Sequence, residues 1–97
     1  MKEGEYMPVI CKFNGIIIKM YFRQKEHNPP HIHAIYGEYV GMFSLYDGEM
    51  FEGDIPLKEQ QMIKEFVRFY QKRLIQMWEQ QDFEKLMPVM LEEYGVK

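Results

Sequence analysis

The chain has 97 residues, of which 46% are hydrophobic and 15% aromatic, and its formal net charge is −3. This length supports one hydrophobic core, so residues 1–97 are expected to form a single domain. The aromatic content excludes a disordered acidic tail, and the net negative charge argues against a general nucleic-acid coat protein.

Cysteine usage and hydropathy predict a cytoplasmic protein. The single cysteine, Cys11, has no partner for an internal disulfide, whereas small domains of oxidising compartments usually carry several bridges. The longest aliphatic run, Ile16–Ile18, is far below the roughly 20 apolar residues of a membrane helix. We therefore expect no signal peptide, no membrane partner and an inert core thiol at Cys11.

The first part of the chain is predicted to form a β-hairpin. Residues 7–13 and 16–22 are rich in β-branched and aromatic side chains. Asn14-Gly15 lies between them and readily supplies the two positive φ angles of a tight turn. Period-two alternation in the second segment predicts a buried face made of Ile18, Met20 and Phe22.

Further strands are predicted after residues 24–30, where polar side chains and two prolines indicate an exposed loop. Residues 31–36 and 39–46 have the composition of two strands joined by a turn, and residues 50–52 add a short last strand. The candidates for the buried face in this region are Tyr39, Phe43 and Leu45.

The second half of the chain is predicted to form one long amphipathic helix, from about Leu57 to Gln80, with Pro56 before its first turn. A short helical turn is expected over 82–87. The predicted fold class is α+β, an antiparallel meander of four or five strands covered by this helix. The apolar stripe of the helix is expected to contain Ile63, Phe66, Val67, Tyr70, Leu74, Met77 and Trp78.

The strongest functional signal is the segment His27-Asn28-Pro29-Pro30-His31-Ile32-His33, which holds all 3 histidines of the chain. Residues two apart in a strand share a face, so His31 and His33 can direct their rings at one point. The prolines stiffen the approach to them. This arrangement suits an acid and base pair, two ligands of a divalent metal, or two donors to an anion. A purely structural role in shaping the loop is the alternative.

Catalysis on RNA would need more than the histidine pair. His31 and His33 would act as acid and base, and a phosphate clamp would be supplied by Lys19, Arg23 and Lys25. Tyr36 could stack against a base. In the hypothesis of one shared site, both histidine rings reach a solvent-accessible pocket beside Lys19 or Arg23.

A metal site is the second alternative at this segment. His27, His31 and His33 are the candidate ligands, and Glu38 is a further candidate. A divalent ion needs at least three protein ligands, and no spacing here identifies the third. The cofactor therefore stays unknown, and a divalent metal is not favoured.

The segment His27 to Tyr39, with the sequence HNPPHIHAIYGEY, resembles a bacterial domain-of-unknown-function family numbered 4160, whose members centre on an HxPPHxH-type motif followed by a YGEY-like strand. The resemblance extends to the early strand pair and to residues 53–56, 74–79 and 84–88. It implies a small partner protein encoded nearby, and some members are regarded as the toxin of a type II toxin–antitoxin pair. Many members carry Trp and His within the helix where this chain has Phe66 and Tyr70, so a mechanism that needs a helix histidine is not expected here. The signature residues are His27, Pro29, Pro30, His31, His33, Tyr36, Gly37, Glu38 and Tyr39.

The leading functional hypothesis is a toxin-like component of a two-protein module that acts on RNA or another cellular target through His31 and His33. The alternatives are a non-catalytic protein-binding module and a small metal-binding protein. Open sheet edges also predict pairing with a second copy or with the neighbouring protein.

Overall fold

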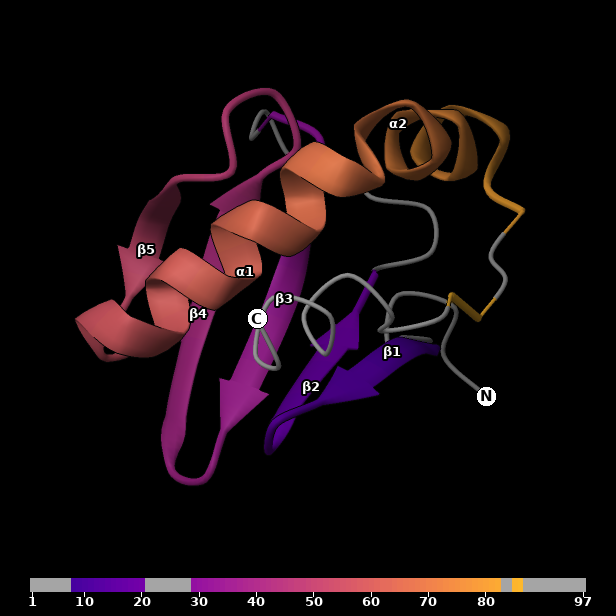
Figure 1. Ribbon diagram of the computed structural model, residues 1–97. Helices are drawn as coiled ribbons and strands as arrows, with labels where there is room; N and C mark the ends of the chain where they lie inside the picture. Colours follow the sequence, from indigo (N-terminus) through magenta and orange to yellow (C-terminus); the bar gives the residue numbers. More distant parts are fainter. Residues whose placement is uncertain (1–7, 21–28, 83–84, 87–97) are drawn as a thin grey trace.

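The computed structural model contains one antiparallel sheet whose strands follow the chain in the order β1-β2-β3-β4-β5 (Figure 1). The structure describes residues 8–20, 29–82 and 85–86. The predicted meander and the α+β class are confirmed, with five strands. These strands are β1 (Val9–Phe13), β2 (Ile16–Lys19), β3 (His31–Tyr36), β4 (Tyr39–Ser44) and β5 (Met50–Gly53).

The turn between β1 and β2 forms as its sequence predicts. Asn14 has φ 48° and Gly15 has φ 80°, the two positive angles that match the twist of a tight hairpin. Of the second strand's predicted buried face, Ile18 and Met20 have no exposed surface, and Phe22 lies outside the described residues.

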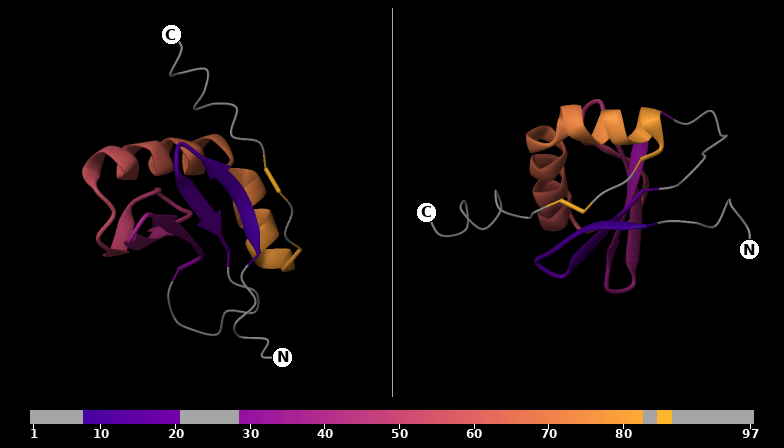
Figure 2. Two further views of the ribbon diagram at one scale, coloured as in Figure 1. Left: turned by 90° about the horizontal axis from the view of Figure 1, so that it is seen from below. Right: turned by 90° about the vertical axis from the view of Figure 1, so that its right-hand side faces the viewer.

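The prediction of one long helix is wrong, because α1 (Leu57–Phe69) and α2 (Gln71–Gln80) are separate helices that meet at Tyr70. A straight helix over both segments would be about 36 Å long, whereas strands of 4 to 6 residues span only about 13 to 20 Å. Its second half would have no surface to pack on. The change of direction at Tyr70 instead sends α2 across the end of the sheet (Figure 2).

The start of α2 is held to the sheet by hydrogen bonds of one side chain. Gln71 Nε2 donates to the carbonyl oxygens of Leu45 at 3.0 Å and of Tyr46 at 2.7 Å, just beyond β4. Leu74 and Met77 of α2 are then buried in the core. Among the described residues, no helix combines the length and apolar character that crossing a membrane would require.

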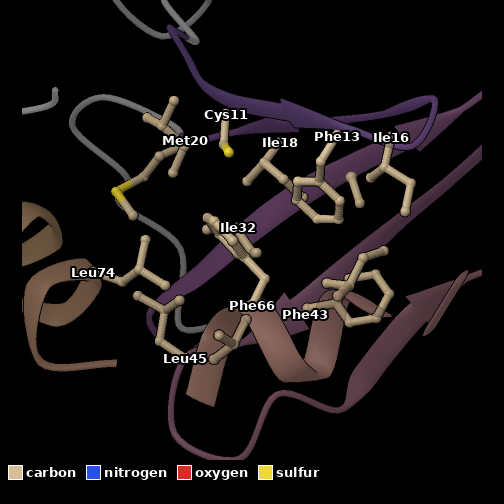
Figure 3. Close-up of a cluster of buried hydrophobic side chains, with 14 of the residues drawn as sticks. Cys11, Phe13, Ile16, Ile18, Met20, Ile32, Phe43, Leu45, Phe66 and Leu74 are labelled. Atoms are coloured by element: carbon tan, nitrogen blue, oxygen red, sulfur yellow. The ribbon is translucent and has the colours of Figure 1, made fainter. Parts of the chain in front are cut away.

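The core lies between one face of the sheet and the two helices (Figure 3). The phenyl rings of Phe13 on β1 and Phe66 on α1 lie 5.3 Å apart, centroid to centroid. Cys11 is also buried, as expected, and burial raises the pKa of its thiol to about 11, so the thiol stays protonated near neutral pH. The fully buried side chains of this core include Ile18, Ile32, Phe43, Phe66 and Leu74.

Tyr39 is a second correction, because its side chain is 43% exposed although it was predicted to be buried. Phe43 and Leu45, the other candidates, are fully buried. Tyr39 pairs with Tyr36 across the β3–β4 hairpin, and their rings stack with centroids 6.4 Å apart. Its place beside the turn explains the exposure, since a side chain at the end of a hairpin has core neighbours on one side only.

The chain after α2 returns to the edge of the sheet. The backbone N–H of Leu86 donates to the carbonyl oxygen of Ile10, the residue after Val9 in edge strand β1, at 2.6 Å. The helical turn predicted over 82–87 is absent at residues 82, 85 and 86, and its other residues lie outside the described part. One edge of the sheet is therefore partly covered by the chain itself.

Candidate functional site

Strand β3 lies at the centre of the sheet and sets the direction of both histidines. Ile32 and Ala34 are fully buried on the face covered by α1, so period-two alternation turns His31 and His33 toward the opposite face. The outer face is the name used below for this second face, which α1 does not cover (Figure 2). The prediction that the two histidines share a face is confirmed by their ring centroids, which are 5.1 Å apart.

His31 is fully buried at 0% exposure. The ring of Trp78 from α2 lies 5.1 Å away and the ring of Phe51 from β5 lies 5.6 Å away, both measured between centroids. The Nδ1 atom of His31 lies 2.7 Å from the carbonyl oxygen of Pro29. A carbonyl oxygen only accepts hydrogen bonds, so Nδ1 carries the proton and the neutral ring keeps its lone pair on Nε2. This Nε2 atom has no hydrogen-bond partner among the described residues.

His33 is half-buried, and its Nε2 atom is shielded from solvent. Desolvation by burial, followed by repulsion from His31, lowers the pKa of His33 from 6.5 to about 4. At neutral pH its imidazole is therefore uncharged and can accept a proton or a hydrogen bond, but it is a poor proton donor.

These positions correct one part of the site hypothesis. The sequence predicted both ring edges in a solvent-accessible pocket, whereas His31 has no exposed surface. The reason is that Trp78, which lies far away in the sequence, packs on its ring once α2 crosses the end of the sheet. The correction concerns access, and the catalytic roles of His31 and His33 stay predictions.

The other candidate residues are only partly brought together. Lys19 on β2 is the cross-strand partner of His33 and shares the outer face. Tyr36 alternates to the opposite, helix-covered face, where the carboxylate of Glu59 raises the pKa of its hydroxyl, so it does not lie beside Lys19 to stack a base on the outer face. Arg23, Lys25 and His27 lie outside the described residues.

The described residues contain no group of three His, Cys, Asp or Glu side chains that could hold a metal ion. Glu38, the extra ligand considered from the sequence, lies exposed in the turn between β3 and β4. That turn is at the far end of β3 from His31. The described part of the chain therefore assembles no such ligand set around His31 and His33, and the third candidate ligand, His27, lies outside it.

A row of apolar side chains on the outer face was missed by the sequence reasoning. The apolar row is the name used here for Ile17, Ile35 and Val40, which are cross-strand neighbours on β2, β3 and β4. Val40 is 54% exposed and the two isoleucines are half-buried. Apolar residues at the outward positions of three adjacent strands were the available signal, because the exposed face of a half-covered sheet usually alternates to polar side chains.

A family model for a domain of unknown function (DUF4160) matches residues 15–79. The matched segment starts in the β1–β2 turn and ends in α2, so it contains His31, His33 and Trp78. No curated protein and no solved structure matches the chain. Because the match covers more than half of the sequence, the chain belongs to the family described as domain of unknown function DUF4160.

Proposed function

We propose that this chain is a protein-binding module that holds a partner protein on the outer face of its sheet. The observation that carries the proposal is the apolar row, since three aliphatic side chains side by side on the face that α1 does not cover are costly to expose to water. Burying them against a partner would release that cost at about 25 cal/mol per Å² of apolar surface.

The charges around the apolar row support recognition of a specific protein. Lys12 lies beside Ile17 on the β1 side of the row, and Glu52 lies on the β5 side of the same face. Charged groups around an apolar centre give an interface its orientation more than its strength. The natural candidate is the small protein that the family resemblance implies to be encoded nearby, which would make this chain one component of a two-protein module.

The burial of the histidines favours recognition over acid and base catalysis. A general acid or base must come within about 3 Å of the proton that it moves, and His31 has no surface for a substrate to reach. His33 has a pKa of about 4, so it lacks the proton that an acid would donate near neutral pH. The pair is therefore better suited to holding structure or a ligand than to cleaving RNA.

The test is a matched pair of substitutions. Val40 and Phe69 are both apolar and are 54% and 55% exposed, but Val40 lies on the outer face and Phe69 lies on α1. With the neighbouring protein co-expressed, Val40→Asp is expected to weaken the complex by about tenfold or more, since it buries a charge, whereas Phe69→Asp leaves it intact. Pull-down and size-exclusion chromatography measure this, with circular dichroism as the check on folding. Equal effects of the two changes would rule out the outer face as the interface.

A second candidate function is a toxin-like activity on RNA at the histidine pair. It is favoured by one observation, the placement of Lys19 directly across from His33 on the same face, where a cation could hold a phosphate. In this hypothesis His33→Ala relieves growth arrest and RNA cleavage in expressing cells, and Lys12→Ala, on the same face but away from the histidines, serves as the control. Intact RNA during arrest by the wild type would reject the ribonuclease activity.

A further inference from the structure

The Nε2 atom of His31 is buried and carries a free lone pair. Its ring is fixed, because Nδ1–H donates to the Pro29 carbonyl at 2.7 Å, and Nε2 has no partner among the described residues. A buried polar atom without a hydrogen bond destabilises the folded state, because its hydration is lost and not replaced. A backbone carbonyl that accepts from one ring nitrogen and orients the other is the usual support of a metal-binding histidine.

Other donors of matching chemistry lie on the same face. The ring of His33 is 5.1 Å from that of His31, and Met42 on β4 is the cross-strand partner of His33. Period-two alternation therefore places two imidazoles and a thioether together on the outer face. The ring of Trp78 lies 5.1 Å from that of His31, centroid to centroid, which adds an aromatic surface able to attract a cation.

We propose that His31, His33 and the thioether of Met42 form a binding site for a soft monovalent cation, Cu(I). Imidazole nitrogen and thioether sulfur are neutral, polarisable ligands, and thioether ligands in particular select Cu(I). The described residues offer no carboxylate cluster here, and a buried site without anionic ligands disfavours a divalent ion because desolvation rises with charge. The site thus differs from the divalent-metal site considered as an alternative from the sequence, both in its sulfur ligand and in the charge of the ion.

The chain carries its own reporter for this site. Trp78 is the only tryptophan, and its ring contacts that of His31, so a heavy cation bound there should quench its fluorescence. Ag(I) serves as a redox-stable probe with the ligand preferences of Cu(I). The titration uses metal-free protein in chloride-free buffer with Cys11→Ala as the background, because the buried thiol of Cys11 is a soft ligand that would compete for Ag(I). Quenching is expected to saturate near one equivalent of Ag(I).

Two matched methionine variants distinguish Ag(I) binding at the proposed site from unspecific Ag(I) binding to methionine side chains elsewhere. Met42→Leu removes the proposed sulfur ligand and should raise the Kd for Ag(I) roughly tenfold or more. Met50→Leu removes a thioether from β5, where Met50 pairs with Phe43 on the helix-covered face, and should leave the Kd unchanged. His33→Ala should weaken binding as Met42→Leu does. A competition assay with a Cu(I) chelator tests whether the wild type and these variants bind Cu(I) with the same order of affinities as Ag(I).

Three results would overturn the proposal. One is quenching that does not saturate, and another is equal weakening by Met42→Leu and Met50→Leu. The third is zinc binding at least as tight as Ag(I) binding, since that would assign the histidines to a divalent ion. Circular dichroism of each variant confirms that a lost signal is not lost folding. None of these measurements involves the partner protein, so they are independent of the proposed docking function.

Discussion

Lowering the pH should destabilise the metal-free protein through His33. Burial, and next the neighbouring His31, lower the pKa of His33 from 6.5 to about 4. Between these two values the unfolded chain binds a proton that the folded protein excludes, so the stability present above pH 6.5 is lost as the pH falls toward 4. The full difference corresponds to about 3 kcal/mol, of which about 2 kcal/mol is already lost at pH 5.

The assay is urea denaturation at pH 7 and pH 5 in the presence of a chelator, followed by the fluorescence of Trp78. His33→Leu replaces the imidazole by an apolar side chain of similar size and removes the titrating group, so its free energy of unfolding should fall by about 2 kcal/mol less than that of the wild type over this interval. The comparison cancels the carboxylates, which titrate in both proteins. If the two proteins lose the same stability within about 0.5 kcal/mol, the burial of His33 is not the source of the pH dependence.

Two further predictions concern the backbone framework. Gln71→Leu removes the hydrogen bonds to the carbonyls of Leu45 and Tyr46 and should lower the free energy of unfolding by about 1–2 kcal/mol. The fluorescence emission of Trp78 should shift to the red, because α2 packs less tightly on the sheet. Unchanged stability with an unshifted emission spectrum would contradict this prediction. Gly53 has φ +127°, and a Cβ added there would lie 2.4 Å from both Gly41 Cα and the Val40 carbonyl oxygen. Gly53→Ala should therefore lower the free energy of unfolding by more than about 2 kcal/mol, measured by thermal or urea denaturation. The control is Gly37→Ala, because Gly37 has φ +62° but an added Cβ would meet nothing within 4 Å. This change should lower the free energy of unfolding by only about 1 kcal/mol. Equal losses of stability in the two variants would refute the steric argument.

The strand half of the fold could be predicted from local chemistry. Asn14-Gly15 specifies a tight turn whatever surrounds it, and its φ angles of 48° and 80° follow. Alternation then decides which side chains point into the core, as Ile18 and Ile32 show. Whether a side chain on the core-facing side is actually buried depends less on the local sequence. Tyr39 lies on the same face as Phe43 but is exposed, because its position at the end of the hairpin cannot be read from its residue type.

Part of the candidate site was also predictable. Residues two apart in a strand share a face, which brought His31 and His33 together. Their burial was not predictable, because the groups that enclose His31 come from Phe51 on β5 and Trp78 on α2. The position of Met42 beside His33 was not predictable either, because it depends on the register between β3 and β4, which the structure provides.

The break at Tyr70 connects the fold to the site. The residues around it contain no glycine or proline, and the periodicity of the apolar stripe continues through it, so the sequence favours an unbroken helix. The break is stabilised by tertiary contacts instead: Gln71 bonds to the chain beyond β4, and Leu74 and Met77 enter the core. An unbroken helix would carry Trp78 past the sheet, away from His31. The end of β3 would then be open to water, and Nε2 of His31 would hydrogen-bond to solvent. The same contacts that turn α2 therefore create the dry, aromatic surroundings that make His31 a candidate ligand for a soft cation.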